Sequence, residues 1–232
     1  MSFDGAACRL ICGLDEAGRG PLAGPVCAAA VVLPQSGHGL QSLLADSKKL
    51  KPKEREEARR AIVEGALAWG VGWATHVEID DINILRASLL AMQRAFACLL
   101  ASDPAAGKAR WPGSLETEAP FGSPFPAEAR PLAFPAGLEA VADGNRAPEL
   151  PVPCAAMVKA DAKVPEVMAA SILAKTARDQ LMEHYARLYP GYGYDRHKGY
   201  PTAEHRRLVL ELGPSPIQRK SFRVVRAGLP GA

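Results

Sequence analysis

Four acidic residues of this 232-residue chain stand where short apolar segments end: Asp15, Glu16, Asp143 and Asp161. Each of them follows or ends an expected strand, and the strands of one sheet can bring such ends together. Four carboxylates at one place cannot all stay ionised without cations. Oxygen-rich sites favour Mg²⁺ or Mn²⁺, and two such ions about 4 Å apart can promote phosphodiester cleavage by water. The shared placement of the acids therefore favours a metal-dependent phosphodiester hydrolase.

Each acid, taken alone, also has an ordinary structural explanation. Asp143 lies in the sequence "DGN", which is typical of a turn. Asp161 could cap the helix that follows it, and the adjacent pair Asp15-Glu16 could form an ion pair with Arg19. For a single residue these explanations are the more common ones. The hypothesis of a site rests on the joint pattern.

The first two acids lie inside an apolar, glycine-rich stretch, "ICGLDEAGRGPLAGPVCAAAVVL" (11–33). Buried carboxylates are costly unless they are paired or bound to metal, so this stretch resembles a site more than a scaffold. A hairpin through Gly18-Arg19-Gly20 is expected to join two neighbouring strands. The small residues at 27–30 would let another element pack closely over the second strand.

Alternation of apolar segments and turn residues predicts an α/β protein with three early and two late strands. Leu85, Leu89, Met92, Phe96 and Leu99 are spaced as one apolar helical stripe. Asn83 before it is expected to be the N-cap of this helix, with a substrate contact as the alternative. The expected strands are 9–15, 25–33, 69–79, 137–143 and 155–161, and the expected helices are 52–68, 82–100, 165–189 and 201–212.

Composition narrows the class of protein further. The hydrophobic fraction is 48%, as in a folded protein, and no apolar run approaches the roughly 20 residues of a membrane span. No signal peptide is evident, and five cysteines without a C-x-x-C pair fit free thiols in a reducing cytoplasm. Residues 101–137 hold seven prolines and four glycines, which predicts a long loop and not a second domain.

Basic residues are concentrated in two segments although the net charge is only +3. Residues 46–60 hold seven Lys and Arg against four acids, and residues 194–226 hold eight against three. Basic clusters with interleaved Tyr and Phe suit a phosphate backbone. For the first cluster, solvated helix faces are the more common explanation, whereas the second is more suggestive of nucleic acid.

Six sequence blocks and a tail occur in an order that resembles ribonuclease HII, the bacterial type 2 ribonuclease H. The resemblance covers roughly residues 9–100 and 138–226. One D-E-x-G-R-G block would only be suggestive, whereas six blocks in order are specific. They read "GLDEAGRGPLAGPV", "DSKKL", "EIDDINILRASLLAMQRA", "ADGNRAP", "VKADAKVPEVMAASILAKTARD" and "YGYDRHKGYPTAEH", with "RKSF" as the tail.

The resemblance implies a ribonuclease H-like catalytic domain over residues 1–226, followed by a flexible tail at 227–232. It implies a mixed five-stranded sheet flanked by helices, with 101–137 as an insertion and 163–226 as the helical C-terminal part. The implied reaction is hydrolysis of the RNA strand of RNA–DNA hybrids and incision 5′ of ribonucleotides embedded in duplex DNA. Products would carry 3′-hydroxyl and 5′-phosphate ends. The enzyme is expected to be a cytoplasmic monomer that does not associate with a membrane.

The resemblance also assigns roles by position. The glycines at 18 and 20 would let the backbone approach the ribonucleotide 2′-hydroxyl, which distinguishes RNA from DNA, and Arg19 would contact phosphate. Tyr200 would stack beside the RNA–DNA junction, and Lys48 and Lys175 would contact phosphates. The implied ligands of two Mn²⁺ or Mg²⁺ ions are Asp15, Glu16, Asp143 and Asp161.

Two alternatives remain at this point. Ribonuclease HIII tends to carry Gly-Lys-Gly at the loop and an extra N-terminal domain, whereas this chain has Arg19 there. A non-catalytic hybrid-binding protein would gain nothing from four acids near phosphates. Ala142 and Ala160 also depart from the family pattern, which often has a larger aliphatic residue and a glycine at these positions, but neither change removes an acid.

Overall fold

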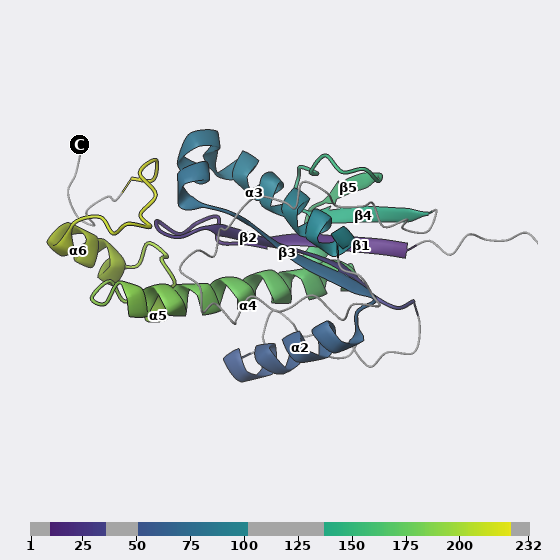
Figure 1. The fold of residues 1–232 in the computed structure, drawn as a ribbon, viewed down its shortest axis with the longest axis horizontal. Coiled ribbons are helices and arrows are strands. Elements are labelled where there is room, and N and C mark those ends of the chain that lie inside the picture. Colours follow the sequence, from purple (N-terminus) through teal and green to yellow (C-terminus); the bar gives the residue numbers. More distant parts are fainter. Residues whose placement is uncertain (1–9, 36–50, 102–136, 224–232) are drawn as a thin grey trace, which may run out of the picture.

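The computed structural model describes residues 10–35, 51–101 and 137–223 (Figure 1). Lys48 and almost all of the expected 101–137 insertion lie outside these described residues. The helices and strands are β1 (Leu10–Ala17), β2 (Val26–Val32), α2 (Pro52–Gly65), β3 (Ala68–Ala74), α3 (His76–Ala101), β4 (Leu138–Asp143), β5 (Cys154–Met157), the 3-10 turn η2 (Ala160–Ala162), α4 (Pro165–Leu188), α5 (Tyr194–His197) and α6 (Ala203–Leu212).

The strands form one mixed sheet in the order β3-β2-β1-β4-β5, which confirms the expected five-stranded architecture. β1 pairs antiparallel with β2, which pairs antiparallel with β3, whereas β4 and β5 join in parallel. Because β1 and β4 are parallel neighbours, Asp15 and Asp143 lie near the C-terminal ends of these two strands, on the same side of the sheet's hydrogen-bonded ladder. This topology is what brings acids 128 residues apart in the sequence to one place.

Helices cover both faces of the sheet (Figure 1). α3 packs on one face in a core that includes Leu14, Ala28 and Phe96, and α4 packs on the other with α2 outside it. Small residues permit this close packing: a β-carbon on Gly72 would lie 2.3 Å from the backbone of α3, and one on Gly13 would lie 2.1 Å from that of α4. In β2, Ala28 and Ala30 are buried in the core with α3, and Cys27 and Ala29 are buried in the core with α4, so elements pack over the small residues 27–30 as expected.

Two predicted boundaries are wrong at the junction of β3 and α3. The strand ends at Ala74 and not at 79, because Thr75 and Glu78 cap a helix that begins at His76. Asn83 lies inside this helix in the left-handed region (φ 68°) and interrupts it. Its side-chain oxygen accepts hydrogen bonds from the N–H groups of Leu85 and Arg86, so Asn83 does cap the second part of α3.

The prediction for the fifth strand is also wrong at its end. β5 stops at Met157, and Lys159 takes up a left-handed conformation (φ 60°) that breaks the extended backbone. Asp161 therefore lies in the following 3-10 turn and does not end a strand. The C-terminal part is helical as expected, with α6 beginning after its cap Thr202 and the extra turn α5 preceding it.

Among the described residues, α3 is long and apolar enough to cross a membrane by length and composition alone. A core helix meets the same criterion, and Ala91, Phe96 and Leu99 of α3 are buried against the sheet. The C-terminal segment forms a third, smaller core in which Leu181, Tyr194 and Ile217 pack with Ala23, so this segment is attached to the stretch between β1 and β2.

Candidate active site

Asp15 and Glu16 lie in the last part of β1, where the sheet gives way to the loop that follows. The Asp15 side chain is buried, with 6% of its surface exposed. Burial raises the pKa of Asp15 to about 8, and the neighbouring carboxylates of Glu16 and Asp143 add to this, while the Ser171 hydroxyl of α4 opposes it. A carboxylate in such surroundings gains strongly from a nearby cation.

Asp143 ends β4 and holds the next acid-bearing turn in place. Its side-chain oxygen accepts a hydrogen bond from the N–H of Ala160 at 2.7 Å. Ala142 and Ala160, the two departures from the family pattern, are both fully buried behind the acids. Asp161 follows Ala160 directly, so the contact made by Asp143 carries Asp161 towards the end of β4 although Asp161 is outside the sheet.

The site is rich in oxygen donors from Asp15, Glu16 and Asp143, whose charges act on one another. Within the described residues, no three His, Cys, Asp or Glu side chains already surround a single metal position. The chemistry of the donors nevertheless fits a divalent ion, because buried carboxylates that repel one another are stabilised by Mg²⁺ or Mn²⁺ and need no His or Cys.

The loop after β1 contains the two glycines of the Gly-Arg-Gly sequence, and they differ in what they require. Gly18 has φ +103°, and a β-carbon on it would lie 2.1 Å from Nε of Arg178. A β-carbon on Gly20 would meet only the ring of Tyr200, at an ordinary 3.8 Å. The fold thus demands glycine at position 18 but leaves room at position 20, where the chain is exposed.

Arg19 extends from the same loop with about half of its side chain exposed. Its guanidinium lies 3.1 Å from a carboxylate oxygen of Glu16, so the ion pair that the sequence left as an alternative does form. It involves Glu16 and not Asp15. The pairing lowers the pKa of Glu16, but burial has the larger, opposite effect, and the net pKa is raised.

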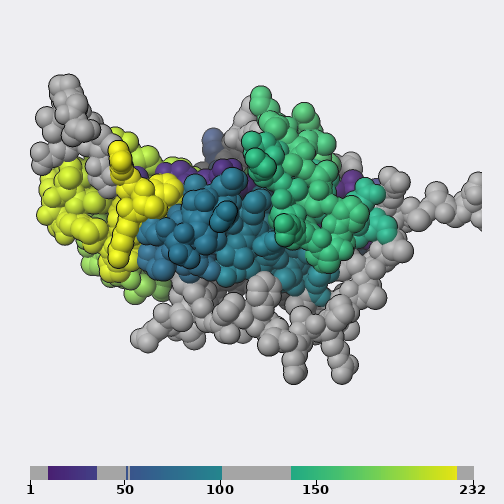
Figure 2. All heavy atoms as spheres, turned by 90° about the horizontal axis from the view of Figure 1, so that it is seen from above, coloured from purple at the N-terminus to yellow at the C-terminus, as the bar shows by residue number. Residues whose placement is uncertain are grey.

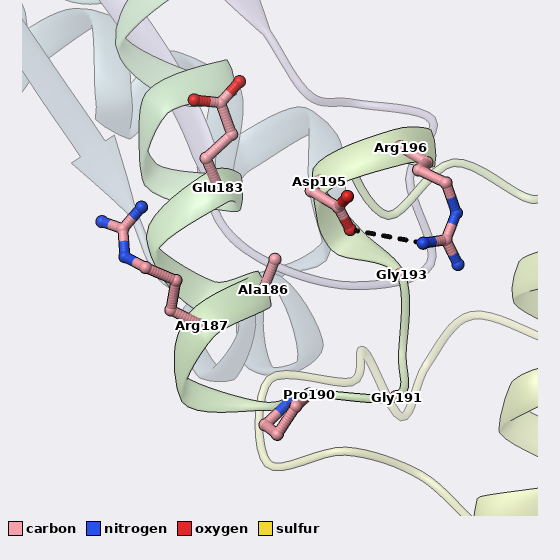
Figure 3. A pocket seen from close by; sticks show the side chains of 8 residues that line it. All are labelled: Glu183, Ala186, Arg187, Pro190, Gly191, Gly193, Asp195 and Arg196. Atoms are coloured by element: carbon pink, nitrogen blue, oxygen red, sulfur yellow. Dashed lines mark ion pairs between the residues drawn. The ribbon is translucent and has the colours of Figure 1, made fainter.

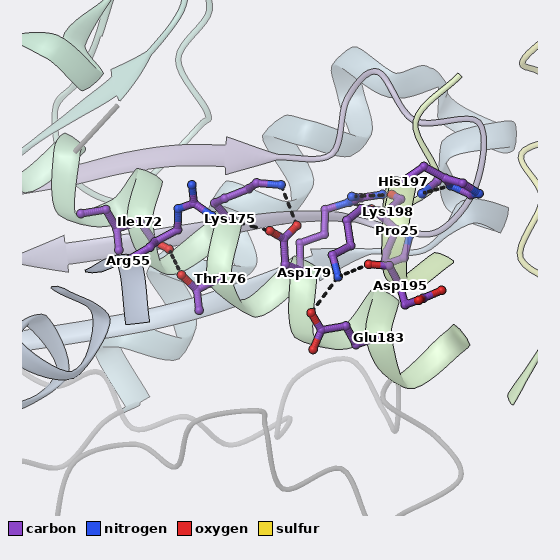
Figure 4. A network of polar contacts seen from close by, with 12 residues as sticks. Pro25, Arg55, Ile172, Lys175, Thr176, Asp179, Glu183, Asp195, His197 and Lys198 are labelled. Atoms are coloured by element: carbon purple, nitrogen blue, oxygen red, sulfur yellow. Dashed lines mark hydrogen bonds and ion pairs between the residues drawn. The ribbon is translucent and has the colours of Figure 1, made fainter. Parts of the chain in front are cut away.

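Tyr200 stands beside this loop, on the segment between α5 and α6. The side chains of Lys175 and Arg178 of α4 lie 5.8 Å from the centre of its ring. Figure 4 shows how Asp179 holds Lys175, whose amino group is 2.6 Å from the carboxylate. The structure therefore brings together Tyr200, Lys175 and the Gly-Arg-Gly loop.

The molecular surface dips between the C-terminal segments and the β4–β5 side, with residues of the β1–β2 region near the bottom of the dip (Figure 2). A separate hollow of about 500 Å³ lies at the other end of α4, around Glu183, Arg187 and Arg196 (Figure 3). Fifteen residues of α4 separate Ser171, beside Asp15, from Ala186 in this hollow, which is about 22 Å along a helix. The hollow therefore belongs to a different part of the molecule.

Three residues around the site were missed in the sequence: Ser171, Arg178 and Arg219. Both arginines are buried, with 1% and 0% of their surfaces exposed. A signal for Arg178 exists, because it stands four residues after Ala174 and three before Leu181 on the buried face of α4. For Arg219 the only signal is its place in the "RKSF" tail.

Comparison with solved structures establishes the fold. Ribonuclease H2 from Pyrococcus horikoshii OT3 matches with a TM-score of 0.62 and 24% identity over 93% of this chain and 94% of that one. The RNase HII of the PCNA:RNase HII complex from Archaeoglobus fulgidus matches with a TM-score of 0.62 and 21% identity over 95% and 98%. Bst-RNase HIII in complex with Mn²⁺ matches with a TM-score of 0.60 and 19% identity over 93% and 68%. The molecule thus has the ribonuclease H fold.

The family follows from closer relatives. The family model for ribonuclease HII matches residues 12–102 and 141–225. The ribonuclease HII of Treponema denticola is 46% identical over 219 residues, which cover 93% of this chain and 98% of the relative. That of Halorhodospira halophila is 46% identical over 222 residues, which cover 95% of each chain. This chain belongs to the ribonuclease HII family and is a metal-dependent endoribonuclease.

Proposed function

We propose that the protein hydrolyses the RNA strand of RNA–DNA hybrids and also incises duplex DNA 5′ of an embedded ribonucleotide. Membership of the family supports action on hybrids. The finer reaction is supported by one observation: only Glu16 and Ala17 separate the buried Asp15 from a loop that is exposed at Gly20, where it faces Tyr200. This adjacency supports a reaction in which the acids hydrolyse a bond next to the sugar that the loop contacts.

The proposed ligands of two Mg²⁺ or Mn²⁺ ions are Asp15, Glu16, Asp143 and Asp161. Bound ions of this kind supply an activated water and stabilise the charge on the leaving oxygen. The chain's own contribution is rigidity: β1 fixes the first two acids, and the hydrogen bond between Asp143 and Ala160 fixes the turn that bears the fourth. The products would then carry 3′-hydroxyl and 5′-phosphate ends.

Recognition of the ribonucleotide is assigned to the loop and to the aromatic ring beside it. A 2′-hydroxyl both donates and accepts hydrogen bonds, so backbone groups at Gly18, Arg19 and Gly20 can distinguish it from a deoxyribose. Tyr200, 38% exposed, can stack on the sugar that follows. Lys175, and Lys48 outside the described residues, are proposed phosphate contacts.

A duplex carrying one ribonucleotide tests this proposal directly. We expect a single incision 5′ of the ribonucleotide in Mg²⁺ or Mn²⁺, a 5′-phosphate on the downstream fragment, and no cleavage with a chelator present. The same duplex built wholly of DNA is the matched control and should stay intact. Incision on the 3′ side, or cleavage of long hybrids without cleavage at the single ribonucleotide, would contradict the proposed reaction.

A further inference from the structure

A buried arginine near the end of the described chain lies directly beneath the Gly-Arg-Gly loop. Arg219 has no exposed surface, and all three of its guanidinium nitrogens donate hydrogen bonds. Every acceptor is a backbone carbonyl oxygen of the loop between β1 and β2. The acceptors are the carbonyls of Gly24 (2.8 Å), Arg19 (3.0 Å), Pro21 (2.8 Å), Gly18 (2.6 Å) and Pro25 (3.3 Å).

These contacts determine which way the loop presents its donors. In a planar trans peptide the carbonyl oxygen of one residue and the N–H of the next point in opposite directions. The carbonyls of Gly18 and Arg19 point inward to Arg219, so the N–H groups of Arg19 and Gly20 point away from it. Both residues are exposed, and the outward side is therefore the side open to a ligand.

The segment that carries Arg219 is itself held in place. Asp80 of α3 accepts hydrogen bonds from the N–H groups of Lys220 and Ser221, both at 2.8 Å, and from the Ser221 hydroxyl. The Phe222 ring lies 5.0 Å from the Arg219 guanidinium carbon and packs against the core under α3. The "RKSF" segment thus connects α3 to the loop between β1 and β2.

Burying the Arg219 guanidinium with only carbonyl oxygens among these hydrogen-bond partners costs folding free energy, because none of them neutralises its charge. That cost indicates that the buried guanidinium has a specific use. Burial and the nearby Arg178 guanidinium lower the pKa of Arg219 to about 9, so it remains charged at neutral pH. Arg178 shares only the Pro25 carbonyl with Arg219. Its other hydrogen bonds go to the carbonyls of Ala23 and Lys198, so it joins the loop to the Tyr200 segment. It is Arg219, and not Arg178, that binds the carbonyls of Gly18 and Arg19.

We propose that Arg219 is a positioning residue for ribonucleotide recognition, which turns the N–H groups of Arg19 and Gly20 outward to meet the 2′-hydroxyl. The proposal rests on the proposed function, because it needs a ribonucleotide at this loop. It assigns to the "RKSF" tail a role in substrate choice, exerted through the loop and without contact with the substrate.

The test compares two affinities measured in one reaction buffer containing Mn²⁺. One is KM for a duplex with a single ribonucleotide, and the other is the inhibition constant of the identical all-DNA duplex. We define the ribonucleotide preference as the inhibition constant of the all-DNA duplex divided by KM for the ribonucleotide duplex, so a rise in KM lowers it. Arg219→Lys keeps the charge but loses the planar fork. We expect its KM to rise about tenfold, the loss typical of one or two hydrogen bonds, while the inhibition constant of the DNA duplex stays the same.

Two further variants keep the test decisive. Asp80→Asn weakens the anchoring of the segment around Arg219 to α3 without altering the guanidinium, and it should also lower the preference. This variant carries the test if Arg219→Lys folds poorly. Arg94→Lys removes a guanidinium whose hydrogen bonds go to Glu78 and the Trp73 carbonyl and not to the loop, and should lower Tm without changing the preference.

The outcomes separate this proposal from the function on which it rests. An unchanged preference in folded Arg219→Lys and Asp80→Asn, with wild-type enzyme preferring the ribonucleotide, would overturn the positioning role alone. A wild-type enzyme that bound both duplexes equally would overturn the proposed function, and the positioning role with it. A fall in preference for Arg94→Lys as large as that for Arg219→Lys would show a general effect of stability and count against the proposal.

Discussion

A β-carbon placed on Gly20 would lie 3.8 Å from Cε1 of the Tyr200 ring, an ordinary contact, whereas one placed on Gly18 would collide with Arg178. The two glycines of the Gly-Arg-Gly sequence therefore lack a side chain for different reasons. Gly18 is required by its backbone conformation and by packing. Gly20 is compatible with a side chain inside the protein, so its lack of one serves something outside.

We therefore predict opposite behaviour for alanine at these two positions. Gly18→Ala should destabilise the protein by about 1–3 kcal/mol because of its left-handed φ and the clash with Arg178, lowering Tm by several degrees. Gly20→Ala should leave Tm within roughly 2 °C of wild type but reduce kcat/KM at an embedded ribonucleotide by about tenfold or more. Thermal melts and kinetics on both variants check this, and wild-type kinetics for a well-folded Gly20→Ala would be incompatible with close approach of substrate.

Tyr200 should influence some substrates more than others. An embedded ribonucleotide always presents an RNA–DNA junction, whereas a long hybrid presents it only at its ends. Tyr200→Ala removes a stacking contact of about 1–3 kcal/mol, which is roughly a ten- to hundredfold loss of rate at the junction. Cleavage of a long hybrid should fall less. Equal losses on both substrates, together with a lowered Tm, would mean that the ring merely supports the segment before α6.

Two stacked histidines that form hydrogen bonds with the backbone of Tyr200 predict a loss of stability in acid. The rings of His197 and His205 lie 4.4 Å apart, and burial lowers the pKa of both below the ordinary value of 6.5. The unfolded chain therefore takes up protons below pH 6.5 that the folded protein resists, and stability falls as the pH drops through that window.

The variant His205→Gln isolates this effect. Its amide can still donate towards the Tyr200 carbonyl, which His205 contacts at 3.0 Å, but it cannot be protonated. We expect Tm to fall less steeply between pH 7 and pH 5.5 in this variant than in wild type. Identical slopes in the two proteins would show that the stacked pair does not govern the acid sensitivity.

Much of the fold was predictable because local pattern and tertiary structure agree. The five strands, the apolar stripe of α3 and the capping role of Asn83 all follow from periodicity and side-chain chemistry. The boundary at Thr75 was missed although the T-x-x-E spacing of a capping box was present in the sequence. The end of β5 was not readable, since a left-handed conformation at Lys159 has no sequence signature.

The sequence predicted that Asp15, Glu16 and Asp143 lie close together, which the structure shows, but it did not predict the side chains that support the neighbouring loop. Asp15 and Asp143 stand out because charge interrupts an apolar strand. The partners of Arg219, by contrast, lie about 200 residues away in the sequence and are backbone carbonyls, which leave no trace in residue type. Burial of a whole arginine also runs against its usual exposure, so composition alone predicts a solvated side chain.

The most direct measurement for the account as a whole is the activity of Asp143→Asn at a single embedded ribonucleotide. Asparagine keeps an oxygen that can accept from the N–H of Ala160, so the turn bearing Asp161 should stay in place while one charge is lost. Glu139→Gln, which removes an exposed acid from the same strand β4, is the matched control.

We expect Asp143→Asn to lose about 10³-fold or more in kcat at saturating Mg²⁺ or Mn²⁺, given the several kcal/mol that metal-assisted charge stabilisation contributes. Its Tm and its affinity for the duplex should remain close to those of wild type, and Glu139→Gln should be fully active. Near-normal turnover by Asp143→Asn under these conditions would contradict the assignment of the acids at the ends of β1 and β4 as the catalytic centre.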